Sequence, residues 1–407
     1  MEEKTNKDVN YIMGESQKFF KAINPNQVTT NKNVVYFNAE KEDNGYLEQL
    51  NNFYNQASSV HSNLINLKRN LIIGNGVTPI SPDIKTQAFL DKINKQGDNF
   101  NDVFNKSALD FALFEAACYQ ILYDSEGEIS TVYHIDTSTV RAEAPDALSI
   151  VNNWYISKNW ADISNKVNRR SSEKTKAVKV ATFNPATWEE DGGVQLLYVK
   201  RYVSGQNVYS IPAYNSAIKY IQLDNELAVF ELNKVSKGFF VSGILFMAGD
   251  PNDEQKKEFK NKFERKYMGT DADKLLYIWG SGDDEKPSFI RTEADKNDTL
   301  FNDLIDISAQ KIATGHGANL ELAGIEGKGV DLGGDANKLN TSLAYFNKNV
   351  IVPMQVVLLS GINKMLSVNG LGPVEITYTP LSVDSDNTED EGNLSKEIKK
   401  ELIKELT

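Results

Sequence analysis

The sequence has very few of the side chains that bind metals or form disulfides. Among 407 residues it contains one cysteine, Cys118, and three histidines, His61, His134 and His316. A single cysteine excludes a disulfide framework and any zinc site built from several cysteines, so we expect a protein of a reducing cytoplasm. The histidines are spread along the chain, and we expect no metal or catalytic site built on paired histidines.

Long apolar runs are also missing. No segment approaches the ~18–20 consecutive apolar residues that a membrane-spanning helix needs. The first residues, MEEKTNKDVNY, lack the basic start and the apolar core of a signal peptide. The sequence therefore predicts no membrane partner.

Positive charge is in short supply. Lys and Arg together number 44 against 56 Asp and Glu, which gives a formal net charge of −12. A protein that grips DNA by neutralising phosphates needs a basic face. Tight DNA binding is therefore not expected, whereas loose or repulsive contact with a polyanion is compatible with the composition.

No motif for catalysis or nucleotide binding is complete. The glycine-dense loop at 322–334 contains GIEGKG, which fails as a phosphate loop because its spacing is wrong and Gly329 stands where a Ser or Thr must hold magnesium. No nucleophile–base pair can be named, so the sequence predicts no enzyme, no cofactor and no metal site. We interpret the loop as mobile, with glycines that allow it to change shape.

The first half of the chain predicts an α+β domain with antiparallel strands, preceded by a polar arm at 1–45 that orders only against a neighbour. The length allows two or three domains, and 40% hydrophobic with 25% charged residues is typical of globular proteins. The expected elements are helices over 46–72 and 100–120, the second with Cys118 on its apolar face; a hairpin of 121–123 and 131–135; and strands at 154–157, 178–183, 194–203 and 207–211.

The second half is organised differently. Helices expected over 213–236 and 300–314 bracket a small β-α-β-β unit, which they could carry away from the main body as a stalk. Their mixed-sign charges suit packing against copies of the chain in a ring, although ordinary solvated helix faces explain the charges equally well. The remaining expected elements are strands at 239–247, 274–279 and 288–291, a charged helix over 250–267, a long helix over 336–366 that Pro353 should kink, a strand at 374–378 and a last amphipathic helix.

The order of these pieces resembles the portal proteins of long-tailed bacteriophages over 46–378. Each piece alone is weakly specific, and their order and spacing together carry the resemblance. The matching stretches are Leu67–Gly74, Gln120–Gly127, Val132–Asp136, the run GFFVSGIL at 238–245, Asp298–Gly317, and the long helix with Pro353. The sequence departs from the family at 318–321, where ANLE replaces a Val-Pro-Pro-like motif.

The resemblance implies an α+β portal-type fold with a wing, a two-helix stem, a small α/β clip, a long kinked helix and a short helical crown. The implied boundaries are an N-terminal arm at 1–45, the first part of the wing at 46–211, a stem helix at 212–237, the clip at 238–292, the second stem helix at 293–317, the tunnel loop at 318–335, the long helix with the second part of the wing at 336–379, and the crown at 380–407.

The resemblance also implies a function and partners. Portal proteins form a ring of about twelve copies at one capsid vertex of the virion, assembled in the host cytoplasm. The ring is the channel for packaging and ejecting double-stranded DNA, which passes weakly and without sequence specificity. Its implied partners are the terminase large subunit, a head–tail adaptor, and the major capsid and scaffold proteins.

The candidate site residues follow from that architecture. The expected channel residues of the tunnel loop are Gly324, Gly327, Lys328, Gly329, Asp331 and Lys338, and those of the stem are Asp303 and Asp306. The expected partner-binding residues of the clip are Lys256, Lys260 and Glu264. The alternative is another ring-forming head–tail connector, or a capsid-associated structural protein, without motor contact. A metal-dependent hydrolase would need a His/Asp cluster that this sequence does not offer.

Overall fold

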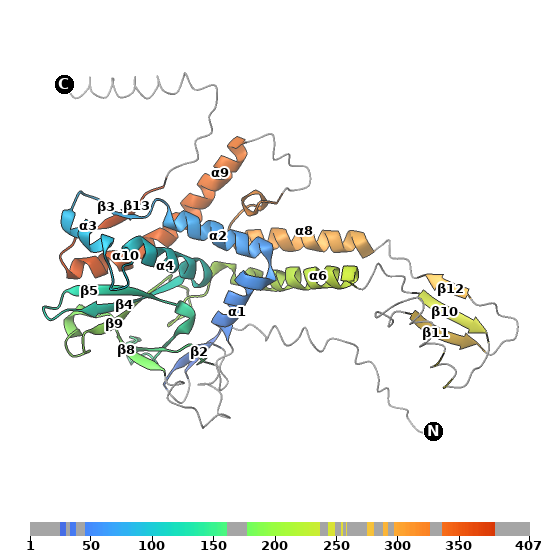
Figure 1. The fold of residues 1–407 in the computed structure, drawn as a ribbon, viewed down its shortest axis with the longest axis horizontal. Helices are drawn as coiled ribbons and strands as arrows, with labels where there is room; N and C mark the ends of the chain where they lie inside the picture. Colours follow the sequence, from blue (N-terminus) through green and yellow to red (C-terminus); the bar gives the residue numbers. More distant parts are fainter. Residues whose placement is uncertain are drawn as a thin grey trace, which may run out of the picture.

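Two packed helices and a small three-stranded sheet extend from one side of a mixed helix-and-sheet body in the computed structural model (Figure 1). The structure describes residues 25–29, 33–37, 45–160, 177–236, 243–248, 254, 258, 275–280, 288–291, 297–325 and 336–378. The expected final helix within 380–407 lies outside these residues. The α+β fold class expected from the sequence is confirmed.

The wing is built on a six-stranded sheet with the order β5-β4-β9-β8-β7-β6. Neighbouring strands are antiparallel except β8 and β9, which run parallel over a short register, Ala181 to Gln195 and Thr182 to Leu196. The expected antiparallel character is therefore right for every pair but that one. The strands are β4 Ala116–Tyr123, β5 Ile129–Ile135, β6 Val140–Ala142, β7 Asn153–Ile156, β8 Val178–Thr182 and β9 Val194–Lys200.

The helix expected over 100–120 is wrong in its last part. α4 (Phe100–Phe114) ends at Glu115, which has the left-handed backbone φ of 51°, and β4 begins at the next residue. Asn99 and Asp102 form a capping box at the other end of α4. Cys118 is consequently a buried strand residue rather than part of a helix face.

The helix expected over 46–72 is interrupted. α1 (Tyr46–Asn52) runs into a π-helical turn, η2 (Phe53–Ala57), and α2 (Ser59–Ile73) starts afresh after Ser58, whose side chain accepts a hydrogen bond from the His61 N–H. Serine is a favoured N-cap because its oxygen satisfies an otherwise free N–H of the first turn. Gly74 ends α2 as expected. Glycine is required at this position because its φ is 52° and because a Cβ there would overlap the carbonyl oxygen of Thr377.

Part of the N-terminal arm is ordered by contacts within the single chain, whereas the sequence predicts that the arm orders only against a neighbour. β1 (Gln27–Thr29) pairs with β2 (Val35–Phe37), and the β2 side chains are buried. Phe37 stacks on Tyr209 at 4.8 Å between ring centroids, and the Tyr209 hydroxyl donates to the Val35 carbonyl oxygen at 2.6 Å. The apolar run at 34–37 explains this order within the chain. The strand expected at 207–211 does not form; instead Gln27 Oε1 accepts from the backbone N–H groups of residues 208 and 209.

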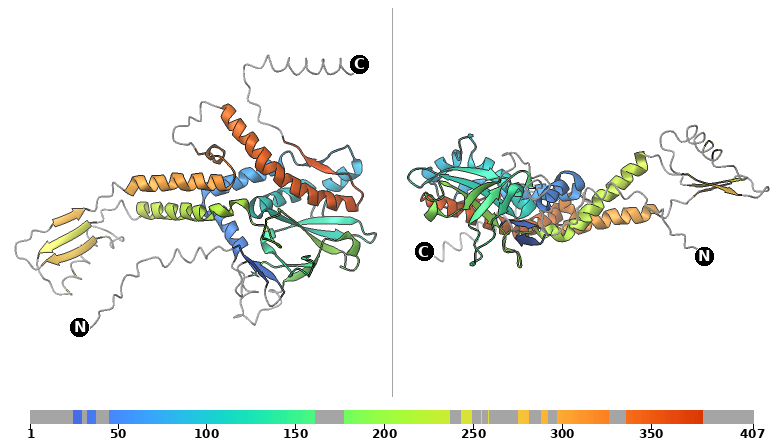
Figure 2. Two further views of the ribbon diagram at one scale, coloured as in Figure 1. Left: turned by 180° about the vertical axis from the view of Figure 1, so that it is seen from behind. Right: turned by 90° about the horizontal axis from the view of Figure 1, so that it is seen from below.

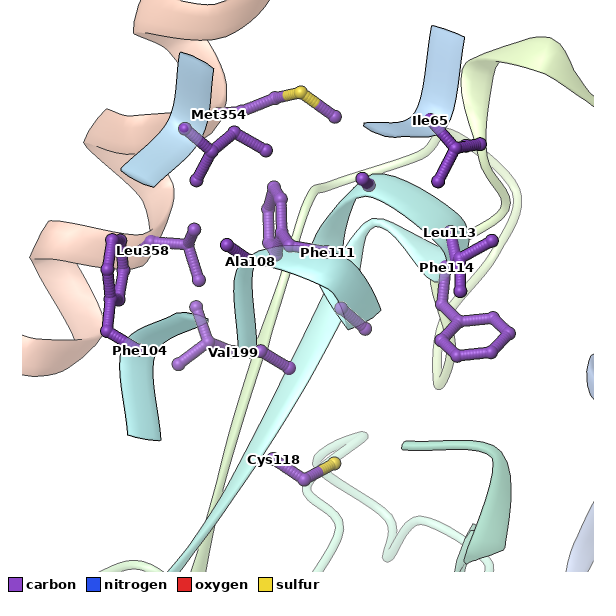
Figure 3. Packing of buried hydrophobic residues seen from close by; sticks show 14 of the residues in the cluster. Ile65, Phe104, Ala108, Phe111, Leu113, Phe114, Cys118, Val199, Met354 and Leu358 are labelled. Carbon is purple, nitrogen blue, oxygen red and sulfur yellow. The ribbon is translucent and has the colours of Figure 1, made fainter. Parts of the chain in front are cut away.

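The wing core lies between the sheet and the helices α2, α4 and α10 (Val352–Val368). Figure 3 shows Phe104, Phe111 and Val199 packed toward Met354 and Leu358 of α10. β3 (Val77–Pro79) pairs with β13 (Val374–Ile376), which joins the end of the chain's described part to its first half, and α3 (Ile84–Asp91) follows β3.

The long helix is continuous but changes to a π-helical turn just before Pro353. α9 (Ala336–Phe346) passes into a π-helical segment, η8 (Asn347–Ile351), and Pro353 occupies the first turn of α10. Proline is tolerated in a first turn because no intrahelical donor is needed there. Pro353 has no N–H to donate to the preceding turn, and the wider π-helical turn accommodates the loss of that hydrogen bond.

The segment Leu339–Val368 is long and apolar enough to cross a membrane by length and composition, with a mean hydropathy of 1.5. Polar residues interrupt its apolar positions, so the segment contains no long uninterrupted apolar run. Met354, Leu358, Ile362 and Met365 from this segment are buried in the wing core. A core helix of a folded domain meets the same criteria, and the packing supports that interpretation.

The stem consists of η6 (Ala213–Ala217) with α6 (Ile218–Ser236), and of α8 (Asn297–Gly315), close to the two helices expected. The two helices lie side by side in all views (Figures 1 and 2). Beyond their far ends lies a sheet with the order β11-β10-β12, in which β10 (Gly243–Ala248) is parallel to β11 (Leu275–Gly280) and antiparallel to β12 (Ser288–Arg291). This matches the strands of the expected β-α-β-β unit.

We predict that Gly315→Ala destabilises the chain by about 1–3 kcal/mol. A Cβ at residue 315 would overlap the Cβ of Ala217, where the two stem helices leave the wing. A loss of stability would be diagnostic of the overlap, because alanine in a helix is otherwise favoured over glycine by up to about 1 kcal/mol. Chemical denaturation measures the change. Gly372→Ala is the control, since its nearest neighbour atom is 3.7 Å away; equal effects of the two changes would contradict the prediction.

Candidate functional site

The expected stem site residues lie together on one helix. Asp303 and Asp306 are three residues apart on α8, so they share a face, and both are exposed. That the channel passes along this face stays a prediction.

The tunnel-loop and clip residues are placed only in part. Gly324 ends the 3-10 turn η7 (Leu320–Ala323) with a left-handed φ of 74°, a conformation that favours glycine. Lys338 lies in the first turn of α9. The other expected loop and clip residues lie outside the described part of the chain: Gly327, Lys328, Gly329, Asp331, Lys256, Lys260 and Glu264. Of the charged helix expected over 250–267, Glu254 and Glu258 are described, both helical and exposed.

The stem exposes a series of large apolar side chains. They are Val229 at 42%, Phe230 at 43% and Leu232 at 68% of α6, with Leu304 at 38% and Ile307 at 44% of α8. Nearer the wing the same helices bury their apolar residues, including Ile221, Leu227 and Ile312. The exposed positions lie in the half of the stem farther from the wing.

At its wing end the stem meets a buried polar group that the sequence analysis did not predict, the stem-root cluster: His61, Lys68, Tyr214 and His316. His61 Nδ1 and His316 Nε2 are 2.9 Å apart although 255 residues separate them. The Tyr214 ring stacks on His316 at 4.8 Å, meets His61 edge-on at 4.9 Å, and has Lys68 Nζ 5.9 Å from its centroid. All four side chains are at most 1% exposed.

The cluster joins three elements. His61 and Lys68 come from α2 of the wing, Tyr214 from η6 at the root of α6, and His316 from the C-cap of α8. α8 ends in a Schellman motif: the Ala318 N–H bonds to the Ala313 oxygen at 2.9 Å, and Gly317, at φ 72°, bonds to the Thr314 oxygen at 3.0 Å. The motif fixes His316 at the helix end, where it faces α2.

Burial sets the electrostatics of the cluster. It lowers the pKa of Lys68 to about 7, with the nearby Arg201 as a second cause. It lowers the pKa of His61 to about 3, and that of His316 well below its ordinary value, with the charge of Lys68 adding to both shifts. Both imidazoles are therefore neutral at physiological pH.

A buried carboxylate holds the root of the first stem helix. Glu115 Oε1 accepts from the Ala213 N–H at 2.8 Å, and Glu115 Oε2 accepts from Arg201 Nε. The Tyr214 hydroxyl donates to the Leu113 carbonyl oxygen at 2.6 Å. The end of α4, the end of β9 and the start of the stem are thereby tied together, and the left-handed turn at Glu115 is what aims its side chain there.

The remaining titratable groups do not assemble a reactive site in the part of the chain that the structure describes. Cys118 is fully buried, and burial raises the pKa of its thiol, which disfavours the reactive thiolate. His134 Nε2 lies 3.0 Å from Asp110 Oδ2, and that carboxylate also accepts from the Thr137 N–H, so this pair ties β5 to α4. No group of three or more metal-ligating side chains occurs among the described residues.

One signal for the cluster was present in the sequence. Lys68 follows Leu64 and Ile65 and precedes Leu71 and Ile72 at helical spacing, so the pattern alone places it on the buried face of α2. Nothing in the sequence pairs His61 with His316, because their contact depends on the return of the second stem helix to the wing.

The comparisons establish the fold. No protein-family model and no curated protein matches the chain. It is similar to a chain of the virion of a native gene transfer agent (GTA) particle, with a TM-score of 0.55, 11% identity, and coverage of 94% of this chain and 91% of that one. It is also similar to a chain in the neck of the native GTA particle computed with C12 symmetry, with a TM-score of 0.56, 12% identity, and coverage of 92% and 91%.

A crystal structure of an HK97-family phage portal protein from Corynebacterium diphtheriae matches with a TM-score of 0.47, 11% identity, and coverage of 79% of this chain and 94% of that one. Of these three, only the GTA chains exceed a TM-score of 0.5, and their nearly full coverage shows that the likeness extends over most of this chain. The α+β fold expected from the sequence is thus shared with chains of the virion and of the neck of a GTA particle.

We predict that Lys68→Met raises the free energy of unfolding by about 1–3 kcal/mol at neutral pH. As the pH falls from 10.5 to about 7, the unfolded chain binds a proton that buried Lys68 does not, so the folded state loses stability across that window. Methionine fills a similar volume without this penalty. Denaturation across pH 7–10 measures the change.

Lys106→Met is the matched control, because the Lys106 side chain is 53% exposed. We expect a change within about 0.5 kcal/mol there. Loss of stability in Lys68→Met would show that the ammonium group is held by favourable contacts and contradict the prediction.

Proposed function

We propose that this chain is a portal protein of a tailed phage or phage-like particle, which forms a ring at one capsid vertex and conducts double-stranded DNA during packaging and ejection. The observation that carries the proposal is the apolar surface of the stem, in a fold shared with a chain of a C12-symmetric neck. The C12 symmetry belongs to that neck, and a ring of about twelve copies is our proposal for this chain.

The exposed apolar residues argue for neighbours. A two-helix stem can bury only the faces that its helices turn toward each other. Leu232 and Ile307, like the other exposed apolar side chains of the stem, face solvent in the single chain. Contiguous apolar patches of this kind mark interaction surfaces. Repetition around an axis would cover them with the stems of adjacent copies.

The long helix supplies a second candidate contact between copies. Val352 and Val356 are 42% and 59% exposed and, four residues apart on α10, share a helix face; Tyr345, 66% exposed, precedes the π-helical segment η8. Lys348 lies between Tyr345 and Val352, Lys364 follows Val356, and no Asp or Glu occurs between 336 and 368. An exposed surface that is apolar and basic suits the acidic surface of an adjacent copy in a chain of net charge −12.

The proposed channel is mainly anionic. Asp303 and Asp306 are exposed on the stem, and facing the bore they would repel the DNA backbone within a screening length of ~8 Å. Lys328 and Lys338 near the tunnel loop would make brief phosphate contacts. Weak, sequence-independent contact is what a conduit requires, since tight phosphate binding would stall the moving duplex.

The partners belong to the same proposal. Lys256, Lys260 and Glu264 of the clip would bind the terminase large subunit during packaging and the head–tail adaptor afterwards, while the wing meets the capsid and scaffold proteins. The motor supplies ATP hydrolysis, so the portal itself needs no enzyme activity. Reversing the charges of these clip residues would distinguish a portal protein from a connector that does not contact the motor. Only a portal protein would lose terminase binding.

We predict that the purified chain forms annular particles and that Leu232→Asp with Ile307→Asp abolishes them. A charge at each position would face apolar surface in the ring and water in the single chain, so the fold survives while assembly fails. Electron microscopy of end-on views, with circular dichroism for the fold, measures both. Val178→Asp is the control at a 62% exposed residue of the wing; rings that survive the stem changes would refute the stem interface.

We predict that Asp303→Lys with Asp306→Lys lowers the yield of packaged DNA while rings still assemble. Positive side chains along the bore would add phosphate contacts that must be broken at each step. Packaged DNA per particle is the measurement. Glu189→Lys with Glu190→Lys, exposed on the wing, makes the same charge change elsewhere. Unchanged yield in the stem variant would exclude these residues from the channel.

A further inference from the structure

The stem-root cluster is the place where all three elements of the stem–wing junction meet. α2 faces both stem roots: His61 contacts Tyr214 before α6 and His316 after α8. Tyr214 and His316 also stack directly on each other, at 4.8 Å with their planes 16° apart. A disturbance of either imidazole therefore acts on both stem helices at once.

The histidine pair is not fully hydrogen-bonded. His61 Nδ1 and His316 Nε2 share one hydrogen bond, while His61 Nε2 and His316 Nδ1 are buried with no hydrogen-bond partner among the residues that the structure describes. Each neutral imidazole carries one N–H and one lone pair. Whichever ring donates, one N–H and one lone pair are left unsatisfied. Once water reaches it, the unsatisfied lone pair takes up a proton when the pH falls below the ordinary histidine pKa of about 6.5.

The surroundings oppose a positive charge on the pair. Lys68 is the charged group whose field acts on both imidazoles. Two further groups act on members of the cluster in addition to burial: Arg201 lowers the pKa of Lys68, and Tyr46 raises that of Tyr214. Glu115, which borders the root of the first stem helix, is already engaged by Arg201 and by the Ala213 N–H. The C-terminal end of the α8 dipole favours an imidazolium at His316, but by only about 0.3–1 kcal/mol.

We propose that the stem-root cluster is a proton-operated lock: with both imidazoles neutral it holds the two stem helices against α2, and uptake of a proton by either imidazole opens the stem roots while the wing stays folded. The lock acts within one chain. It therefore does not depend on ring formation or on DNA passage, and its test can fail or succeed independently of the proposed function.

Hydrogen exchange of the full-length chain, read by mass spectrometry, tests the lock. His134→Gln is the background, because it leaves His61 and His316 as the only imidazoles. An imidazole that becomes exposed on opening has an ordinary pKa near 6.5, whereas the buried imidazole stays neutral. When the pH falls from about 7.5 to about 5.5, this difference raises the equilibrium constant for opening roughly tenfold. After correction for intrinsic rates, we expect about tenfold more opening at 213–217 and 312–318 per imidazole involved.

Two sets of variants keep the proposal falsifiable. His61→Gln and His316→Gln, each in the same background, should reduce the acid-induced opening, and the double variant should abolish it. Lys68→Met keeps both imidazoles and removes the opposing charge, so it should weaken the pH response even if a histidine variant misfolds. An unchanged response in these variants, or acid-induced exchange spread evenly over the wing strands β4 and β9, would overturn the lock.

Discussion

The packing of both stem roots on α2 is the constraint on which the rest of the structure depends. Tyr214 and His316 enter the cluster from helices whose far ends lie next to the β10–β12 sheet (Figure 1). Gly315 and Ala217 approach so closely that no extra methyl group fits between them. The sheet beyond the stem therefore has its position set by a junction of a few buried side chains, and anything that loosens this junction moves the whole projection.

The order of elements could be predicted from the sequence because each has a local signal, such as helical periodicity in the stem or the turn before β5. Prediction from local signals was wrong where the same apolar pattern suits both a helix and a strand. Residues 116–120 are apolar at both helical and strand spacing, and only the left-handed turn at Glu115 decides for a strand. The burial of β2 and the pairing of His61 with His316 depend on tertiary contacts across 174 and 255 residues, which no window of sequence contains.

Charge is distributed unevenly, and the distribution agrees with the architecture. The long helix at 336–368 has no acidic residue, whereas α8 carries Asp298, Asp303 and Asp306. Two buried ionisable groups of the stem–wing junction show how charge is accommodated there: Glu115 is engaged by Arg201, and burial lowers the pKa of Lys68 to about 7. The His61 and His316 imidazoles and the Lys68 amine of the junction are thus groups whose charge depends on pH, whereas the permanently charged Arg141, also fully buried, is paired with Glu48.

In a stem of two helices, only the contact between the two helices is buried within the stem itself. The polarity of the remaining helix faces therefore indicates what surrounds the stem. In a monomer every other face meets water, and Leu232 at 68% exposure is then unfavourable by up to about 2 kcal/mol relative to burial. In a ring each stem has two neighbours, and only the inner and outer faces stay wet. Apolar Leu304 and Ile307 beside acidic Asp303 and Asp306 on the same helix suit that second environment, in which our proposed contact covers the apolar side chains and the carboxylates at its edge stay in water.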